Sequence, residues 1–164
     1  MALQPPPGFS LRPLLPSDAA EVAELFRASI EVLAEDDYGD AQRAAWAGAA
    51  DDEAQFVARL APMTVLVALS GPRIAGFVAL AGGESLHMLY THPDFARRGI
   101  ATYLLRATET LARGRKAARL KAEVSDTAHP LFMRHGFVPL RRNSVLVGEE
   151  WLANTSMEKV LGER

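Results

Sequence analysis

The segment Leu86–Ala112 constrains the fold most strongly, because its hydrophobic pattern changes from that of a strand to that of a helix around one short turn. An apolar stretch ends at His92-Pro93, and a brief turn then leads into Arg97-Arg98-Gly99. After the glycine, apolar residues recur at helical spacing until about Gly114. The pattern predicts a strand, a turn and an amphipathic helix in direct succession, as α/β proteins use.

The turn before this expected helix has the properties of an anion-binding site. A helix N-terminus leaves about four backbone N–H groups unpaired and carries about half a positive charge, so it attracts anions. Arg97 and Arg98 lie at this end, where the helix dipole disfavours cations unless a polyanion binds. Gly99 has no side chain and Ala101 only a methyl group, which lets a phosphate approach the backbone. A solvated basic turn is the simpler interpretation of so short a motif.

The rest of the chain predicts further elements around this segment. Ser17 is a candidate N-cap for the first helix. Helical spacing of apolar residues predicts the first helix over residues 18–34 and further helices over residues 41–47, 51–60 and 128–135. The expected strands cover residues 9–14, 64–69, 73–81, 85–91, 119–124, 137–140, 145–147 and 156–161.

These elements predict an α/β fold with a mixed, mostly antiparallel twisted sheet and helices on both faces. The strand over 119–124 follows a helix, so it can lie parallel to the strand over 85–91. Such a splayed parallel pair would open a slot that leads away from the anion-binding turn. Residues 1–8, which contain three consecutive prolines, are expected to be a flexible lead, and residues 9–164 to form a single domain.

The composition argues against several classes of function. A net charge of −2 gives no reason to expect nucleic acid as a partner, and no apolar run is long enough to span a membrane. The chain has no cysteine, which excludes disulfides and a cysteine nucleophile and is compatible with a cytoplasmic location. The histidines do not have the spacing of metal ligands, so we expect no metal site.

The sequence resembles the GNAT superfamily of N-acetyltransferases, which use acetyl-coenzyme A (acetyl-CoA). The pyrophosphate motif of the superfamily, Gln/Arg-x-x-Gly-x-Gly/Ala, corresponds to Ala96–Ala101, where alanine departs from the first position. A second signature, Asn-x-x-Ala-x-x-x-Tyr-x-x-x-Gly-Phe, corresponds to Ser125–Phe137, where serine replaces asparagine and Phe132 replaces tyrosine. The acidic stretch before Trp46 and the Asn-x-x-Met motif at Asn154 resemble a bacterial subgroup, and the likeness covers nearly the whole chain.

The resemblance implies a binding site for acetyl-CoA at the strand end, the turn and the second signature. The backbone of the strand end would pair with the pantetheine amides and donate a hydrogen bond to the developing oxyanion. The cofactor-binding residues that it implies are Leu89, Tyr90, Thr91, Arg97, Arg98, Gly99, Ile100, Ala101, Thr102, Ser125, Ala128 and Phe132.

Two residues near the start of the strand over 85–91 are candidates for the base that deprotonates the amine. The superfamily often has a glutamate at the position of Ser85, which cannot act as a base. The candidates are the adjacent Glu84 and His87, which shares the face of Ser85 by strand alternation. A half-buried structural histidine is the simpler interpretation of His87.

The general acid is less well defined by the sequence. The position at which the superfamily has a tyrosine holds Phe132, which has no proton to give. Either the thiolate leaves unassisted or the proton comes from Ser125, Tyr90 or Tyr38.

The resulting hypothesis is an enzyme that transfers an acetyl group from acetyl-CoA to a primary amine of a small molecule or peptide, by direct attack in a ternary complex. The acidic residues of Glu35–Asp40 lie where the superfamily binds its acceptor and can attract a cationic amine, although such a cluster is usually a solvated loop. Exposure of the strand tail over 145–161 would suggest a homodimer. The departures at Ser85, Ala96 and Phe132 leave open an acyl-CoA-binding module without catalytic activity, and the acyl group can also be one other than acetyl.

Overall fold

Seven strands form one mixed sheet in the order β1-β2-β3-β4-β5-β7-β6, in a computed structural model that describes residues 3–162. The strands are β1 (Phe9–Pro13), β2 (Thr64–Ser70), β3 (Arg73–Ala81), β4 (Ser85–Thr91), β5 (Arg119–Ser125), β6 (Val138–Val147) and β7 (Glu150–Val160). The α-helices are α1 (Ala19–Ala28), α2 (Asp40–Ala47), α3 (Glu53–Leu60), α4 (Ile100–Gly114) and α5 (His129–Arg134). Short 3-10 or π turns cover Pro16–Asp18, Ser29–Leu33, Gly48–Ala50 and Pro93–Phe95.

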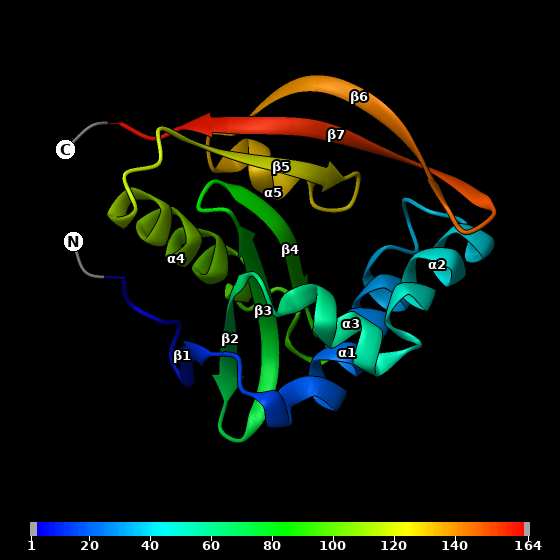
Figure 1. Cartoon of the computed structure of the whole chain (residues 1–164), viewed down its shortest axis with the longest axis horizontal. Coiled ribbons are helices and arrows are strands. Elements are labelled where there is room, and N and C mark those ends of the chain that lie inside the picture. Colours follow the sequence, from blue (N-terminus) through cyan, green and yellow to red (C-terminus); the bar gives the residue numbers. More distant parts are fainter. Residues whose placement is uncertain (1–2, 163–164) are drawn as a thin grey trace.

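The pair β4–β5 is the parallel pair of this sheet, and the other neighbouring strands are antiparallel. Its register consists of Ser85 opposite Lys121 and Leu86 opposite Ala122. Beyond Leu86 the two strands diverge toward their carboxyl ends, as Figure 1 shows. The expected α/β sheet with a splayed parallel pair is therefore confirmed, and the opening between β4 and β5 lies at the end of β4 that leads to α4.

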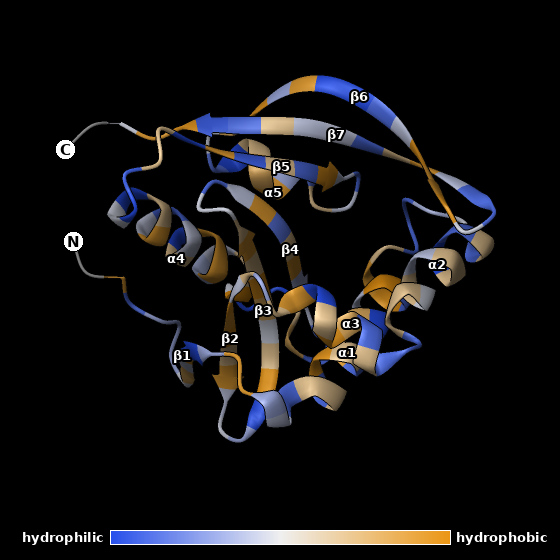
Figure 2. Cartoon of the chain, in the orientation of Figure 1, coloured by the Kyte–Doolittle hydropathy of each residue, from blue (hydrophilic) through white to orange (hydrophobic). Residues whose placement is uncertain are grey.

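Two hydrophobic cores lie on opposite faces of the sheet. One contains buried side chains of α4 and α5, such as Leu104 and Phe132, packed against β3–β5. The other contains side chains of α1 and α3, such as Phe26 and Phe56, packed against Phe77 of β3. Figure 2 shows hydrophobic residues along β2 and β3 and polar residues along much of β6, which lies at the sheet edge.

A β-bulge interrupts β4 at His87. The pairing with β3 steps from Met88 opposite Ala79 to Leu86 opposite Leu80, which leaves His87 without a direct partner. Leu86 packs in the α4 core whereas Met88 packs in the α1 core, so the bulge reverses the faces of the residues that follow it.

The structure differs from the expected elements at two places. The first helix starts with a 3-10 turn whose N-cap position is Leu15, not Ser17. The Asp18 carboxylate accepts the Leu15 N–H at 2.7 Å and pairs with Arg12, so the cap is a tertiary ion pair and not a local serine. In place of the three short strands expected over 137–140, 145–147 and 156–161, the structure has two long strands, β6 and β7. The polar residues within β6 do not interrupt it, because a strand at the sheet edge tolerates them.

Within residues 3–162, no helix is long and apolar enough to cross a membrane.

Candidate active site

The N-terminus of α4 presents free backbone N–H groups at the end of the β4–α4 turn. Its first helical hydrogen bond runs from the Tyr103 N–H to the Gly99 carbonyl at 3.0 Å, so the N–H groups of the three preceding helical residues point out of the helix end. Gly99 has a φ of 82° and Arg97 a φ of 61°, both in the left-handed region. Left-handed turn residues beside a free helix N-terminus are a common setting for anion sites, and anion binding at this turn stays a prediction.

The two arginines of the turn differ in their surroundings. The Arg98 guanidinium lies over the rings of Phe9 and Phe95, at 5.1 and 5.6 Å from their centroids. Arg97 is exposed on the same turn. Pro6 lies beside Gly99. It belongs to the N-terminal lead over residues 1–8, whose flexibility stays a prediction. Of the two arginines, Arg97 is the better placed to reach a bound phosphate.

The other predicted cofactor-binding residues of α4 are Ile100, Ala101 and Thr102, and they differ in the group that can face a ligand. The Ile100 side chain is buried against β3, so only its N–H can face a ligand. Thr102 Oγ1 lies 3.4 Å from His135 Nε2, and Ala101 lines a cavity described below.

The edge of β4 that faces β5 presents unpaired backbone groups beyond the bulge. The Lys121 N–H donates to the Glu84 carbonyl at 2.8 Å, whereas the His92 N–H donates to the Ala75 carbonyl of β3 at 2.8 Å. Because the hydrogen-bonding direction alternates along a strand, the N–H groups of Leu89 and Thr91 point toward β5, where pairing has already ended. These are two of the residues predicted to hold the pantetheine amides and the oxyanion.

Three cavities adjoin one another in the opening between β4 and β5, and Trp46, Tyr90 and Ser125 line all of them. The strand cavity, of about 60 Å³, lies between the two strands and is also lined by His87, Leu89, Glu123, Ala128 and Phe132. The helix cavity, of about 180 Å³, extends toward the N-terminus of α4 and is also lined by Ile30, Leu33, Leu89, Thr91, Ala101 and Ala128. The hairpin cavity, of about 170 Å³, extends toward the β6–β7 hairpin and is also lined by Tyr38, Glu123, Val147, Leu152, Ala153 and Asn154.

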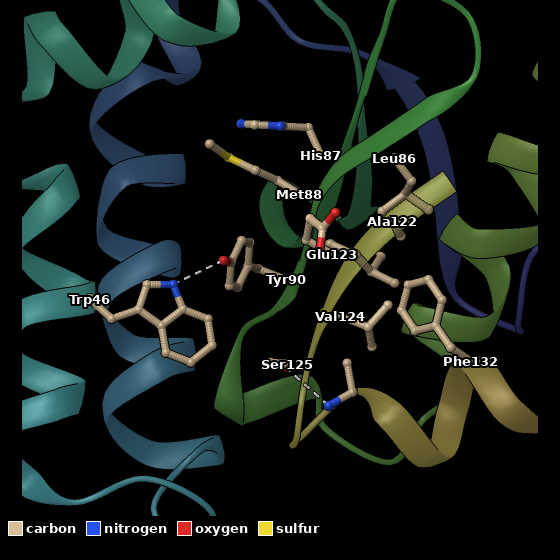
Figure 3. A pocket seen from close by; sticks show the side chains of 12 residues that line it. Trp46, Leu86, His87, Met88, Tyr90, Ala122, Glu123, Val124, Ser125 and Phe132 are labelled. Atoms are coloured by element: carbon tan, nitrogen blue, oxygen red, sulfur yellow. Dashed lines mark hydrogen bonds between the residues drawn. The ribbon is translucent and has the colours of Figure 1, made fainter. Parts of the chain in front are cut away.

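Tyr90 occupies the junction of the three cavities (Figure 3). Its hydroxyl accepts a hydrogen bond from the Trp46 Nε1–H at 3.2 Å, and its ring packs at 4.7 Å from that of Phe26. Burial raises the pKa of Tyr90 to about 12, so it stays a phenol at neutral pH. Because the indole N–H can only donate, the Tyr90 hydroxyl keeps its own proton available for the cavity.

His87 projects from the bulge into the strand cavity. Burial and the positive charge of Arg59 lower the pKa of His87, which favours the neutral imidazole that can accept a proton. Glu84, the other predicted base, pairs with Lys121 Nζ at 3.3 Å and does not line any of these three cavities. The structure thus brings His87, and not Glu84, together with Tyr90 and Ser125.

Ser125 and Phe132 occupy the far wall of the opening. Ser125 Oγ accepts the Ala128 N–H at 3.1 Å at the start of α5. Phe132 is 2 % exposed and packs at 4.9 Å from the ring of Phe137, so it closes the strand cavity as an apolar wall. The sequence predicted both as site residues, and both line the strand cavity.

Glu123 and Asn154 line the hairpin cavity, and Trp46 and Tyr38 contribute aromatic surface to it. The Tyr38 hydroxyl donates to the Ala153 carbonyl at 2.6 Å and accepts the Asp126 N–H at 2.9 Å, while burial raises the pKa of Tyr38. Glu123 is not among the site residues that the sequence predicts. The charged residues of β5 alternate with apolar ones, a pattern that is typical of a solvated strand face and carries no signal of a cavity.

Within the part of the chain that the structure describes, no group of three or more His, Cys, Asp or Glu side chains is arranged to hold a metal ion.

Comparisons with known proteins agree with this geometry. A family model described as an acetyltransferase (GNAT) domain matches residues 34–161. The uncharacterized N-acetyltransferase YafP of Escherichia coli K12 is 28% identical over 147 residues, which are 90% of this chain and 93% of YafP. The crystal structure of a GCN5-related N-acetyltransferase from Rhodopseudomonas palustris is 46% identical, with a TM-score of 0.92 and coverage of 98% of this chain and 99% of that one. PaiA N-acetyltransferase from Thermoplasma acidophilum, solved with coenzyme A, has the same fold at 16% identity, with a TM-score of 0.76 and coverage of 93% and 98%.

Proposed function

Because the chain belongs to the GNAT family of acetyltransferases, we propose that it transfers an acetyl group from acetyl-CoA to a primary amine of a small molecule or peptide. One observation carries the proposal. The helix cavity leads from Ala101, at the anion-binding end of α4, to the junction at Tyr90, where it meets two further cavities. A long cofactor and a separate acceptor can therefore approach one point from different directions.

The residues of the turn and of β4 fit acetyl-CoA. The pyrophosphate is assigned to the N–H groups that open α4, with Arg97 beside them. The pantetheine amides are assigned to the β4 edge at Leu89 and Thr91, where β5 is too far away to pair. PaiA, which has the same fold, was solved with coenzyme A, which supports this assignment.

When bound, acetyl-CoA supplies an activated thioester, whose carbonyl carbon the amine attacks directly as the C–N bond forms and the C–S bond breaks. His87 takes a proton from the ammonium group of the acceptor, directly or through water, so that the nitrogen lone pair becomes available. The Leu89 or Thr91 N–H stabilises the charge that develops on the carbonyl oxygen. The Tyr90 hydroxyl is the donor best placed to hydrogen-bond the leaving sulfur. The departing thiolate takes up the second proton of the attacking nitrogen, so the products are the acetylated amine and free thiol.

The test is the release of free thiol from acetyl-CoA with a panel of primary amines. His87→Ala is expected to lower kcat by about 10²- to 10⁴-fold, the usual contribution of a general base, while the Kd for coenzyme A stays unchanged. Glu84→Ala tests the other predicted base in the same assay. The wild-type rate is expected to fall as the pH drops through the lowered pKa of His87, because the protonated imidazole cannot accept a proton.

A second candidate function is an acyl-CoA-binding module without catalysis. It is favoured by Phe132, a buried side chain without a proton at the position of the expected acid. Tight binding of coenzyme A with no thiol release for any amine would decide for this second function. Faster thiol release from another acyl thioester than from acetyl-CoA would instead identify a different acyl group.

A further inference from the structure

The hairpin cavity contains a carboxylate that is held in place by neutral partners. Glu123 Oε2 accepts a hydrogen bond from Ser156 Oγ at 2.6 Å and from Asn143 Nδ2 at 3.0 Å. Asn143 Nδ2 also lies 3.0 Å from Asn154 Oδ1. Side chains of β6 and β7 thus fix the Glu123 side chain of β5, and Figure 3 shows its carboxylate beside Met88 and Tyr90 in that view.

The Glu123 side chain is exposed, and its carboxylate has no salt-bridge partner among the described residues. Within residues 3–162 no ion pair involves Glu123, because the neighbouring Lys121 pairs with Glu84 and Arg142 pairs with Asp126. A carboxylate held by two neutral donors keeps acceptor capacity on its other oxygen. Such an arrangement favours a cationic ligand in the cavity.

The hairpin cavity also has apolar walls and is of limited size. Trp46, Val147 and Leu152 form its walls, and Leu152 is 7 % exposed. Its volume of about 170 Å³ is close to that of cavities of about 150 Å³ that hold a benzene molecule. The cavity therefore suits an apolar body of about the size of one six-membered ring.

The position of Glu123 connects this cavity to the point of acetyl transfer. Glu123 lines both the hairpin cavity and the strand cavity, and His87 lines the latter. The acetyl group is assigned to the β4 edge at Leu89, which also lines the strand cavity. A nitrogen held by Glu123 would therefore lie in the cavity that the predicted base and the predicted thioester position also line.

We propose that the hairpin cavity is the acceptor site, and that Glu123 binds the ammonium group of a primary amine with a compact apolar body. This proposal rests on the proposed acetyl transfer to a primary amine and names the acceptor class. Glu123 is a specificity-determining residue here, and the proton is still removed at His87. Asn143 and Ser156 are positioning residues that act through Glu123.

The first experiment measures thiol release with benzylamine for wild type and Glu123→Gln. The variant keeps the size of the side chain but loses its charge, so KM for benzylamine is expected to rise about 10- to 100-fold, with a smaller change in kcat and an unchanged Kd for coenzyme A. Glu158→Gln is the matched control, because Glu158 pairs with Arg119 on the neighbouring strand and lines none of the three cavities. An unchanged KM in Glu123→Gln would overturn the proposal.

The second experiment tests the same site without turnover. Calorimetry with coenzyme A-saturated protein is expected to show binding of benzylamine, at least tenfold weaker binding of benzyl alcohol, and loss of the preference in Glu123→Gln. Equal affinities in the wild type, or no binding of benzylamine, would overturn the proposal. Charge-dependent binding in a protein that releases no thiol with any amine would refute the proposed function while it supports this acceptor site.

A third variant tests the size of the cavity. It leaves Glu123 unchanged, so its result stands even if Glu123→Gln does not fold. Val147→Trp adds volume at the partly exposed wall of the hairpin cavity. It is expected to raise KM for benzylamine about tenfold or more and to leave that for ethylamine within about twofold, since the smaller body needs less of the cavity. An equal effect on both amines, or none on either, would place the acceptor elsewhere.

Discussion

Replacement of Gly76 by alanine should separate the first turn of α4 from the sheet. A Cβ atom at Gly76 would lie 2.9 Å from Ile100 Cγ2, 2.9 Å from the Tyr90 carbonyl oxygen and 3.1 Å from Leu104 Cδ1. The carbonyl belongs to the backbone of β4 and can move only with that strand, whereas Ile100 and Leu104 belong to α4, so both the strand and the helix must shift. Overpacking of this kind costs about 1–3 kcal/mol, which corresponds to a fall in Tm of about 2–12 °C for a chain of this length.

The same shift should weaken cofactor binding, because Ile100 is the first residue of the helix whose N-terminus is assigned to the pyrophosphate. Differential scanning calorimetry gives Tm, and titration calorimetry with coenzyme A gives Kd. Gly114→Ala is the control at the other end of α4, since a Cβ there meets nothing within 4 Å, and we expect an unchanged or higher Tm. A Gly76→Ala protein with the Tm and Kd of the wild type would refute the packing argument.

Three further predictions address charge and assembly. Arg97→Glu should weaken binding of coenzyme A much more than that of pantetheine, which lacks the phosphates; equal effects in titration calorimetry would contradict the phosphate assignment. Arg12 and a backbone N–H lower the pKa of Asp18, so this carboxylate stabilises the fold above the pKa of the unfolded chain and loses that effect as the pH falls through its folded pKa. Asp18→Asn should therefore lower Tm at pH 7 and differ less from wild type in strong acid, and a constant difference at all pH values would exclude this linkage. The exposed apolar side chains of Leu146 and Trp151 on the β6–β7 hairpin favour a homodimer, which light scattering tests; a monomer at high protein concentration would reject it.

The cofactor half of the site was predictable because its signals are local in the sequence. Gly99, with its left-handed backbone, and the arginines before it follow directly on a strand and open a helix. A turn of this kind places its N–H groups by backbone geometry, which depends little on distant residues. The strand–turn–helix pattern therefore predicted the free N-terminus of α4 and the opening between β4 and β5 beside it, to which the cofactor is assigned.

The proposed acceptor site was not predictable, because no local sequence pattern encodes it. Glu123 lies on a strand whose apolar and charged residues alternate, as they do on a strand with one solvated face. It becomes a cavity residue because β4 diverges from β5 and because Asn143 and Ser156 reach it from β6 and β7. Trp46, on a helix far from these strands in sequence, adds the opposite wall.

The bulge at His87 connects these two halves and could not be inferred from strand alternation. Before the bulge, the Glu84 carbonyl faces β5, and β4 and β5 are paired. After the bulge, the His92 N–H faces β3. The extra residue reverses the sides to which the following residues point. The Leu89 N–H therefore faces the opening between β4 and β5, while the Tyr90 side chain packs with the α1 core. A regular β4 would direct the backbone and side chains of these residues to the opposite sides. The single irregular position thus lets one short strand present backbone N–H groups to the opening between β4 and β5 and an aromatic hydroxyl to the three cavities.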